Sequence, residues 1–382
     1  MLGGMFLFLA SSYFSIAVNS LSLGLMAVSW CAIMVWERRS IVERTVLDYV
    51  FLAYVLAELV ATAFSVNPAQ SIFFSRRLLL IGIVYFFTTW VKTEGLAKAV
   101  IGTLLGTATL VALFGVAKLL LVPPEQTTRL GIFQFYMTTA ELMMIATLLL
   151  LPFAIHAGTP RAVRIASLLA LIPVLVSLYA TVTRGAYIAA AAGALFIALV
   201  RNRRLVIPLL VVVVLLIVFA PPYVENRLRG IVDINHPENA SRLMLWSIGL
   251  RIFADHPVVG VGDIDLGDLF RAYADPGSAI LWGHLHNVPL QFLVTLGFLG
   301  FVVVVVMFGK IFVAQWKVYR THRDDWFASS VALGSLALFV GMQVTGLVEW
   351  SFGDQEVATV FWAMLGLTLA TGQIQRAPTS VE

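Results

Sequence analysis

Charged residues are scarce in this chain of 382 residues, where only 12% are Asp, Glu, Lys or Arg and 60% are hydrophobic. A soluble protein carries about 25% charged residues, so the composition excludes an ordinary water-soluble domain. Cys31 is the only cysteine, which excludes an intrachain disulfide. The formal net charge of +4 is small, and it indicates no nucleic-acid partner.

Long apolar runs recur along the chain and are separated by short polar breaks. Runs of this length predict an all-α integral membrane protein with about twelve transmembrane helices. The first two spans could form a hairpin. We expect the spans to be centred roughly at residues 12, 29, 56, 82, 108, 146, 173, 192, 212, 297, 338 and 363.

Positive charge alternates from loop to loop, and this alternation predicts the topology. With the N-terminus in the cytoplasm, most of the 25 Lys and Arg fall in segments predicted to lie inside, as the positive-inside rule requires. Those segments are "ERRSIVER", "KTEGLAK", "HAGTPRAVR", "RNRR", "KVYRTHRDD" and the C-terminal tail. An even number of spans also places the C-terminus in the cytoplasm. We therefore divide the chain into a transmembrane bundle (1–220), an outer loop (221–285), C-terminal transmembrane helices (286–372) and a cytoplasmic tail (373–382).

The remaining basic residues are all arginine except Lys118, and they are predicted to lie on the outer side. They are Arg76, Arg77, Lys118, Arg129, Arg184, Arg227, Arg229, Arg242, Arg251 and Arg271. Topology alone does not favour arginine at these positions. The guanidinium is a planar, permanently charged fork that suits phosphate oxygens, so we infer an anion site on the outer side.

The loop over residues 221–285 is much longer than the other connections, and long loops of this kind are usually functional. Within it, "SRLMLWSIGLRIFADH" predicts an amphipathic helix lying along the membrane surface, with Leu243, Trp246 and Leu250 on one face. Ser241 is the expected N-cap, which would put Arg242 in the first turn.

Three residues are the main candidates for chemistry. His286 begins a long apolar helix, and a neutral imidazole there can accept a proton from a hydroxyl near pH 7. Arg184 lies in "ATVTRGAYIAAAAG", a polar break between two apolar runs, where an arginine needs a partner or a water-filled cavity. Arg242 opens the loop helix. A helix-capping histidine and headgroup-facing arginines are the alternatives that the residues alone leave open.

Weaker signals come from several neighbouring polar residues. Supporting candidates are Arg76, Arg77, Arg129, His284, Asn287 and Glu349. The carboxylates of Glu58 and Glu141 lie within apolar runs, so we expect each to be paired or to face a cavity. No group of His, Cys, Asp or Glu has metal-ligand spacing, and no phosphate-binding P-loop occurs, so we expect neither a metal, a cofactor nor direct use of ATP.

Together these motifs resemble the O-antigen ligase and polymerase superfamily of bacterial envelope glycosyltransferases. The strongest match is "HNVPLQFLVTLGFLG", with His-Asn at 286–287 and Gly-x-x-Gly at 297–300. The segments "TRGA", "RLMLW", "HPVVGVG", "ATAFSVNPAQS", "RLGIF" and "EWSFGDQEV" extend the likeness over nearly the whole chain. Phe301 and Val302 stand where some ligases have small hydroxyl residues, which leaves the subfamily open.

The resemblance implies a GT-C-like fold in the bacterial inner membrane. It also implies transfer of a glycan from undecaprenyl pyrophosphate to an acceptor hydroxyl at the periplasmic face. Carried over to this chain, His286 would be the catalytic histidine, and Arg184 and Arg242 would bind the donor pyrophosphate. The acceptor would be lipid A–core oligosaccharide in a ligase and a second lipid-linked glycan in a repeat-unit polymerase of O-antigen or exopolysaccharide.

We expect the ligase activity, metal-independent and with inversion at the anomeric carbon. A polytopic transporter or lipid flippase is the alternative from another class. It would place ionisable residues near the bilayer midplane in two repeated halves, whereas the candidate charges here cluster on one predicted side.

Overall fold

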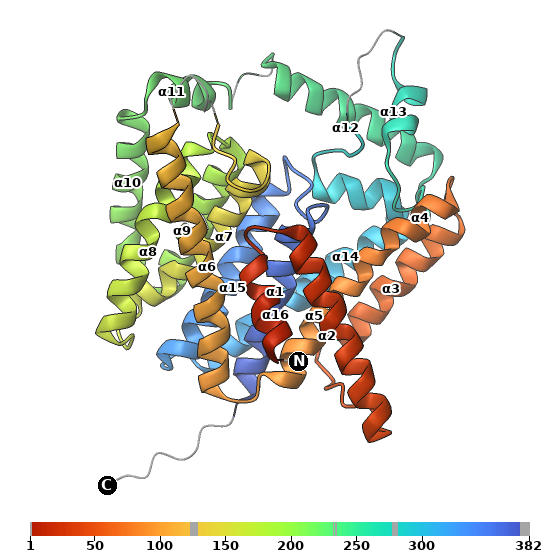
Figure 1. Ribbon diagram of the computed structural model, residues 1–382. Helices are drawn as coiled ribbons and strands as arrows, with labels where there is room; N and C mark the ends of the chain where they lie inside the picture. Colours follow the sequence, from red (N-terminus) through yellow and green to blue (C-terminus); the bar gives the residue numbers. More distant parts are fainter. Residues whose placement is uncertain (1, 123–128, 232, 234, 277–281, 375–382) are drawn as a thin grey trace.

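The computed structural model describes the chain except for residues 1, 123–128, 232, 234, 277–281 and 375–382. Every regular element in this part is helical and no strand occurs in it, which confirms the all-α prediction (Figure 1). The elements are α1 (Leu2–Ser11), α2 (Ile16–Glu37), α3 (Asp48–Ala63), α4 (Pro68–Ser75), η1 (Arg76–Ile81), α5 (Gly82–Trp90), α6 (Glu94–Leu121), α7 (Tyr136–Ile155), α8 (Arg161–Ala180), α9 (Arg184–Arg201), η3 (Arg203–Leu205), α10 (Val206–Val218), α11 (Pro222–Arg229), α12 (Pro237–Asp255), α13 (Gly267–Tyr273), α14 (Val288–Thr321), α15 (Trp326–Thr345) and α16 (Gln355–Gln373).

Among the described residues, 8 helices are long and apolar enough to cross a membrane, when α4, η1 and α5 are taken as one. They coincide with the expected spans near residues 29, 82, 108, 146, 173, 192, 297 and 338. The expected centres near 56, 212 and 363 fall within α3, α10 and α16, and the centre near 12 falls in the turn after α1. The protein is therefore a multi-span helical membrane protein, and the count of about twelve spans stays a prediction.

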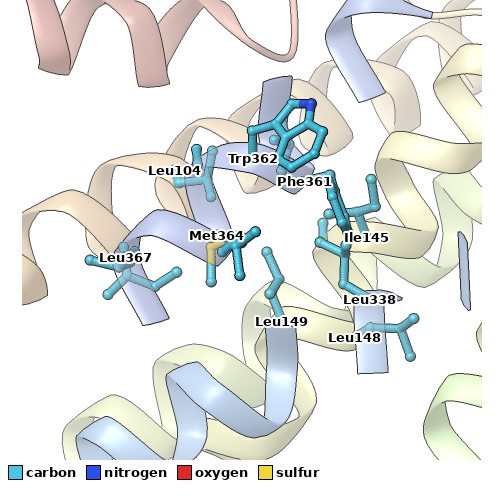
Figure 2. Close-up of a cluster of buried hydrophobic side chains, with 14 of the residues drawn as sticks. Leu104, Ile145, Leu148, Leu149, Leu338, Phe361, Trp362, Met364 and Leu367 are labelled. Atoms are coloured by element: carbon cyan, nitrogen blue, oxygen red, sulfur yellow. The ribbon is translucent and has the colours of Figure 1, made fainter. Parts of the chain in front are cut away.

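The centre of the bundle is formed by α7, α15 and α16, which are apolar around their whole circumference and are buried on nearly every side. Helices with this pattern belong in the middle of a large protein. Figure 2 shows side chains of these helices, including Ile145, Leu338 and Phe361, in one cluster. Small residues permit the close contacts, because a Cβ on Gly193 of α9 would lie 2.6 Å from Leu148 of α7.

Four of the segments predicted to lie inside meet at one end of the bundle. The carbonyl of Arg323 accepts a hydrogen bond from Nη1 of Arg201 at 3.2 Å and lies 3.4 Å from Nε2 of His156. Nζ of Lys98 lies 5.1 Å from the ring centroid of Trp326. The helices α8 and α9 run between this end and the turn at 181–183, so that turn lies at the opposite end.

The long loop over 221–285 forms α11, α12 and α13, which lie across the end of the bundle opposite those basic segments (Figure 1). A small core of its own attaches it to α14, and this core includes Ile248, Phe270 and Val294. The expected start of the amphipathic helix is wrong. The helix α12 begins at Pro237 with His236 as its N-cap, so Arg242 lies in the second turn and Ser241 is not the cap. Of the predicted apolar face, Leu243 and Leu250 are exposed, whereas Trp246 is half-buried and its Nε1 donates to the carbonyl of Leu285 at 2.9 Å. The placement of this helix along the membrane surface stays a prediction.

The two glycine motifs of the sequence pack against each other. The backbone of α14 is interrupted at Gly297, whose φ of 65° lies in the left-handed region that favours glycine. This interruption frees the carbonyls of Val294 and Thr295, which accept hydrogen bonds from Val261 and Gly262 at 3.0 and 2.9 Å. A Cβ on Gly297 would lie 2.4 Å from the carbonyl carbon of Val258, so only glycine fits there.

Candidate active site

His286 lies in the short segment that leads into α14, and its position is fixed by the loop that follows α15. Asn287 caps α14 by accepting from the amide of Leu290 at 2.8 Å, and its Nδ2 donates to the carbonyl of Leu347 at 2.9 Å. His286 itself is buried, and its backbone φ of 47° is in the left-handed region. A non-glycine residue held there is strained, and such strain is concentrated at functional sites.

The imidazole of His286 is paired with the carboxylate of Glu349, whose Oε1 lies 2.8 Å from Nδ1. Burial acts to raise the pKa of Glu349, but the hydrogen bond and charge of His286 and the amide of Trp350 outweigh it and lower that pKa. Glu349 is therefore ionised and can only accept hydrogen bonds. Nδ1 of His286 must therefore carry a proton and donate it to Oε1, so Nε2 is the ring nitrogen left to act in proton transfer.

Arg242 and Glu141 complete this group from two further helices. Nη2 of Arg242 lies 4.0 Å from Oε2 of Glu349, so the guanidinium balances the carboxylate without binding it closely. Oγ of Ser351 donates to Oε1 of the buried Glu141 at 3.0 Å, which meets the expectation of a partner for that carboxylate. The other carboxylate within an apolar run, Glu58, lines a pocket together with Arg77.

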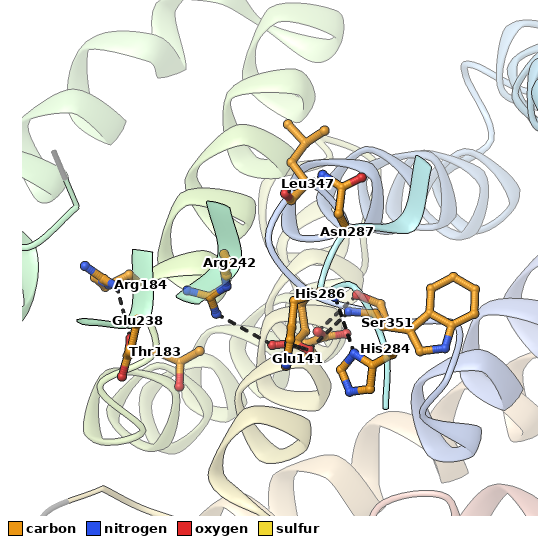
Figure 3. A network of polar contacts seen from close by, with 12 residues as sticks. Glu141, Thr183, Arg184, Glu238, Arg242, His284, His286, Asn287, Leu347 and Ser351 are labelled. Carbon is orange, nitrogen blue, oxygen red and sulfur yellow. Dashed lines mark hydrogen bonds and ion pairs between the residues drawn. The ribbon is translucent and has the colours of Figure 1, made fainter. Parts of the chain in front are cut away.

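Arg184 is the first residue of α9 and is buried except for 8% of its surface. Its Nη2 donates to Oε2 of Glu238 at 3.0 Å and to Oδ1 of Asn239 at 3.1 Å, both at the start of α12. Gly230 provides the space, because a Cβ there would lie 2.9 Å from Nη1 of Arg184. Arg184 and Arg242 are close enough to interact electrostatically, and Figure 3 shows Arg184 beside Glu238 and Arg242 directed toward the group around His286.

Arg129 is tied to the turn that precedes Arg184. Val182 has a φ of 51°, unusual for a β-branched residue, and its carbonyl accepts from Nη2 of Arg129 at 3.1 Å. The guanidinium lies over the ring of Tyr136 at 3.5 Å and its Nη1 is 3.9 Å from Oε1 of Glu238. Burial lowers the pKa of Arg129, although the group stays charged near neutral pH. The supporting candidate Arg129 thus joins Arg184.

Glu238 pairs most closely with Arg227. The sequence analysis named Arg227 only as one of the outer basic residues and did not identify Glu238 as a site residue. Nη2 of Arg227 lies 2.8 and 3.0 Å from the two carboxylate oxygens of Glu238. Burial would raise the pKa of Glu238, but the hydrogen bonds and charges of its arginine partners lower it overall. The only sequence signal is an acidic residue in the first turn of a helix, which is typical of any helix.

The supporting arginines Arg76 and Arg77 are placed differently. Arg76 is exposed, and its guanidinium lies 3.9 Å from the ring centroid of Phe73. Arg77 forms an ion pair with Asp263 at 3.3 Å and is close enough to affect His284 electrostatically. Arg77 therefore borders the site, on the side of His284.

The ring of His284 contacts that of the catalytic candidate in a tilted arrangement, with 4.1 Å between the ring centroids of His284 and His286 and 56° between their planes. Burial, and next the neighbouring His286, lower the pKa of His284 to about 4, so its ring is neutral. The potential ligand atoms of His284, His286 and Glu349 all lie within 4.8 Å of one another, a grouping that could hold a metal ion. The sequence spacing did not predict this grouping. The positive charges of Arg242 and Arg77 beside it oppose a divalent cation there.

Comparison with known proteins gives a family match over part of the chain. No curated protein matches the chain. The family model described as O-Antigen ligase matches residues 168–305, a stretch that contains Arg184, Glu238, Arg242 and His286. Over these residues the chain is similar to the O-antigen ligase family, which supports the resemblance drawn from its motifs.

Proposed function

We propose that the protein is an O-antigen ligase-type glycosyltransferase. In this proposal it transfers a glycan from undecaprenyl pyrophosphate to a hydroxyl of lipid A–core oligosaccharide at the periplasmic face of the inner membrane, in a GT-C-like fold. The observation that supports it best is the His286–Glu349 pair, 2.8 Å between Nδ1 and Oε1, beside an arginine-rich anion site at the same end of the bundle.

The proposed reaction is a displacement at the anomeric carbon. The acceptor hydroxyl attacks that carbon, the bond from the carbon to the pyrophosphate oxygen breaks, and the bond's electron pair leaves with undecaprenyl pyrophosphate. Nε2 of His286 takes the hydroxyl proton, and the ionised Glu349 stabilises the imidazolium that forms, as in other carboxylate–histidine pairs. Attack from the face opposite the pyrophosphate inverts the anomeric carbon.

The arginines take the role of charge stabilisation. Negative charge grows on the departing pyrophosphate, and guanidinium groups placed in advance lower the energy of that transition state. Arg184 and Arg129 are held by neighbouring backbone and side chains, whereas Arg242 is the arginine nearest the histidine pair. In this proposal the leaving group is already activated, so the transfer needs no nucleotide.

Reconstitution in lipid vesicles tests the proposal. The purified protein is given an undecaprenyl-pyrophosphate-linked glycan and either lipid A–core oligosaccharide or a second lipid-linked glycan. Product size separates glycosylated lipid A–core from a lengthened lipid-linked chain, which would instead indicate the polymerase. A His286→Ala variant should reach the membrane folded and transfer nothing, while His322→Ala, near the opposite end of the bundle, serves as the matched control.

A product from neither acceptor would contradict the proposal. Movement of the lipid-linked donor across the vesicle bilayer without transfer would instead support the flippase alternative. Near-normal transfer by folded His286→Ala would remove the imidazole from catalysis.

A further inference from the structure

Glu238 occupies the centre of three guanidinium groups. Its carboxylate contacts Arg227 at 2.8 Å, Arg184 at 3.0 Å and Arg129 at 3.9 Å. These arginines come from three separate parts of the chain, namely α11, the start of α9 and the segment before α7. One carboxylate therefore balances three positive charges, and the group keeps an excess of two.

The hydrogen-bonding capacity of this group is also only partly used. Nη1 of Arg184 and Nε of Arg227 are buried, and neither has a hydrogen-bond partner among the described residues. A carboxylate offers two oxygen atoms, whereas a pyrophosphate diester offers four unbridged oxygens and two negative charges. The arginines are thus better matched, in charge and in number of donors, to a pyrophosphate than to Glu238.

We propose that Glu238 is an internal substitute for the donor pyrophosphate, which displaces it, and that Arg227 and Arg129 are donor-binding residues alongside Arg184. This inference rests on the proposed function, because the displacing anion is the pyrophosphate of a polyprenyl-linked donor. The carboxylate holds the guanidiniums in place while the site is empty. It leaves when an anion of higher charge arrives, so it competes with the donor.

The position of Glu238 makes displacement feasible. Its side chain is 36% exposed, whereas that of Arg184 is 9% exposed, so the carboxylate lies on the accessible side of the arginines. It belongs to the first turn of α12, which is capped by the ring of His236, with Nδ1 3.3 Å from the amide of Glu238, and which Asn239 joins to the carbonyls of Gly230 and Asp233. A first turn can fray or shift without unfolding the rest of its helix.

Displacement also links the two halves of the site. Glu238 and Arg242 are four residues apart on α12, so they lie on the same face of that helix. Arg242 is 4.0 Å from Glu349, so that carboxylate does not hold its guanidinium closely, and its charge also acts on Arg184. A pyrophosphate that replaces Glu238 would thus recruit Arg242 from the histidine pair toward the leaving group.

The test measures binding of farnesyl pyrophosphate, a short prenyl pyrophosphate, to the purified full-length protein by equilibrium dialysis. Removing the competing charge in Glu238→Gln should tighten binding about 3- to 10-fold. Arg227→Lys, which loses the bidentate fork, should weaken it about 10-fold. The controls are Glu225→Gln and Arg229→Lys, because those two residues form an exposed ion pair with each other on α11; both should bind as the wild type does.

Unchanged or weaker binding by Glu238→Gln would overturn the inference, because it would make Glu238 a permanent counter-ion. Binding too weak to detect in the wild-type protein would overturn it as well. If Glu238→Gln does not fold, Glu238→Asp withdraws the carboxylate by one methylene and should tighten binding to a smaller degree. Glycan transfer is measured separately, so that a protein that binds as expected but transfers nothing refutes the proposed function and leaves the substitute role of Glu238 standing.

Discussion

Replacing Glu349 by glutamine tests the histidine pair directly. The amide can still accept a hydrogen bond from Nδ1 of His286, but it removes a negative charge 2.8 Å from the ring that becomes positive during proton transfer. At an effective dielectric of about 20, a charge pair at that distance is worth roughly 6 kcal/mol. The side chains of His286 and Glu349 are only 8% and 17% exposed, so solvent replaces little of it.

Part of that energy is recovered because burial of an uncharged amide costs less than burial of a carboxylate. We therefore expect kcat to fall by about 10²- to 10⁴-fold in Glu349→Gln, which corresponds to about 3 to 5 kcal/mol. The assay is transfer in vesicles at saturating donor, with the exposed Glu225→Gln as the control. A fall of less than about 10-fold in a folded Glu349→Gln protein would refute the charge-stabilising role.

The pH dependence of the same comparison gives a second result. The pKa of Glu349 is lowered, so its carboxylate is charged at every pH above that depressed value, and its contribution is lost only as the pH falls through it. The carboxyl of Glu349 should therefore stay ionised between about pH 8 and pH 5, so infrared difference spectra of wild type against Glu349→Gln should show no carboxylic-acid carbonyl band in that range. Such a band near pH 6, present in the wild type and absent from Glu349→Gln, would mean that the carboxylate is protonated there, contrary to its pairing with His286.

Three further predictions concern the arginines, metal dependence and the helix interruption. Arg184→Lys and Arg242→Lys should each lower transfer about 10- to 100-fold, because an ammonium lacks the bidentate fork. Arg251→Lys is the control, since Arg251 is exposed. Full activity in both Arg184→Lys and Arg242→Lys would argue against pyrophosphate binding by these side chains. Transfer should survive EDTA, and activity that is lost and then restored by Mg²⁺ would contradict the metal-free proposal. Gly297→Ala should lower the thermal unfolding midpoint strongly or prevent folding, since its Cβ would meet Val258. The control is Gly309→Ala on the same helix, which should keep the wild-type midpoint because no atom lies within 4 Å of its new Cβ. Equal midpoints for the two variants would refute the packing argument.

Much of the fold follows from local properties of the sequence. Long apolar runs require helices in a bilayer, and eight of the expected span positions coincide with helices of sufficient length and hydropathy. The start of α12 was misplaced because Ser241 is a good capping residue in a sequence read locally. The proline at 237, which favours the first helical position, was the better signal, and the ring of His236 caps the helix instead.

The site was accessible to sequence reasoning only in part, for a physical reason. His286 and Arg184 stand out because polar groups at the ends of apolar helices are expensive without a partner, and Arg242 stands out as an arginine in the helix predicted for the outer loop. Their partners do not stand out, because Glu238 and Glu349 look like ordinary helix-start and loop acids. Glu238 meets Arg184 from 54 positions away in the chain, and Glu349 meets His286 from 63 positions away. Local sequence patterns carry no information about such distant contacts.

Those two carboxylates place opposite demands on the site. Four guanidiniums gathered at one end of the bundle repel one another, and Glu238 and Glu349 reduce that repulsion while no donor is bound. Because each carboxylate is negative, each also lowers the affinity of the site for an incoming anion. Glu349 stabilises the imidazolium that forms during catalysis, so it must stay beside His286 when the donor binds. Glu238 contacts no proton-transfer group, and its charge only stabilises the empty site, which is why it is the carboxylate that can leave.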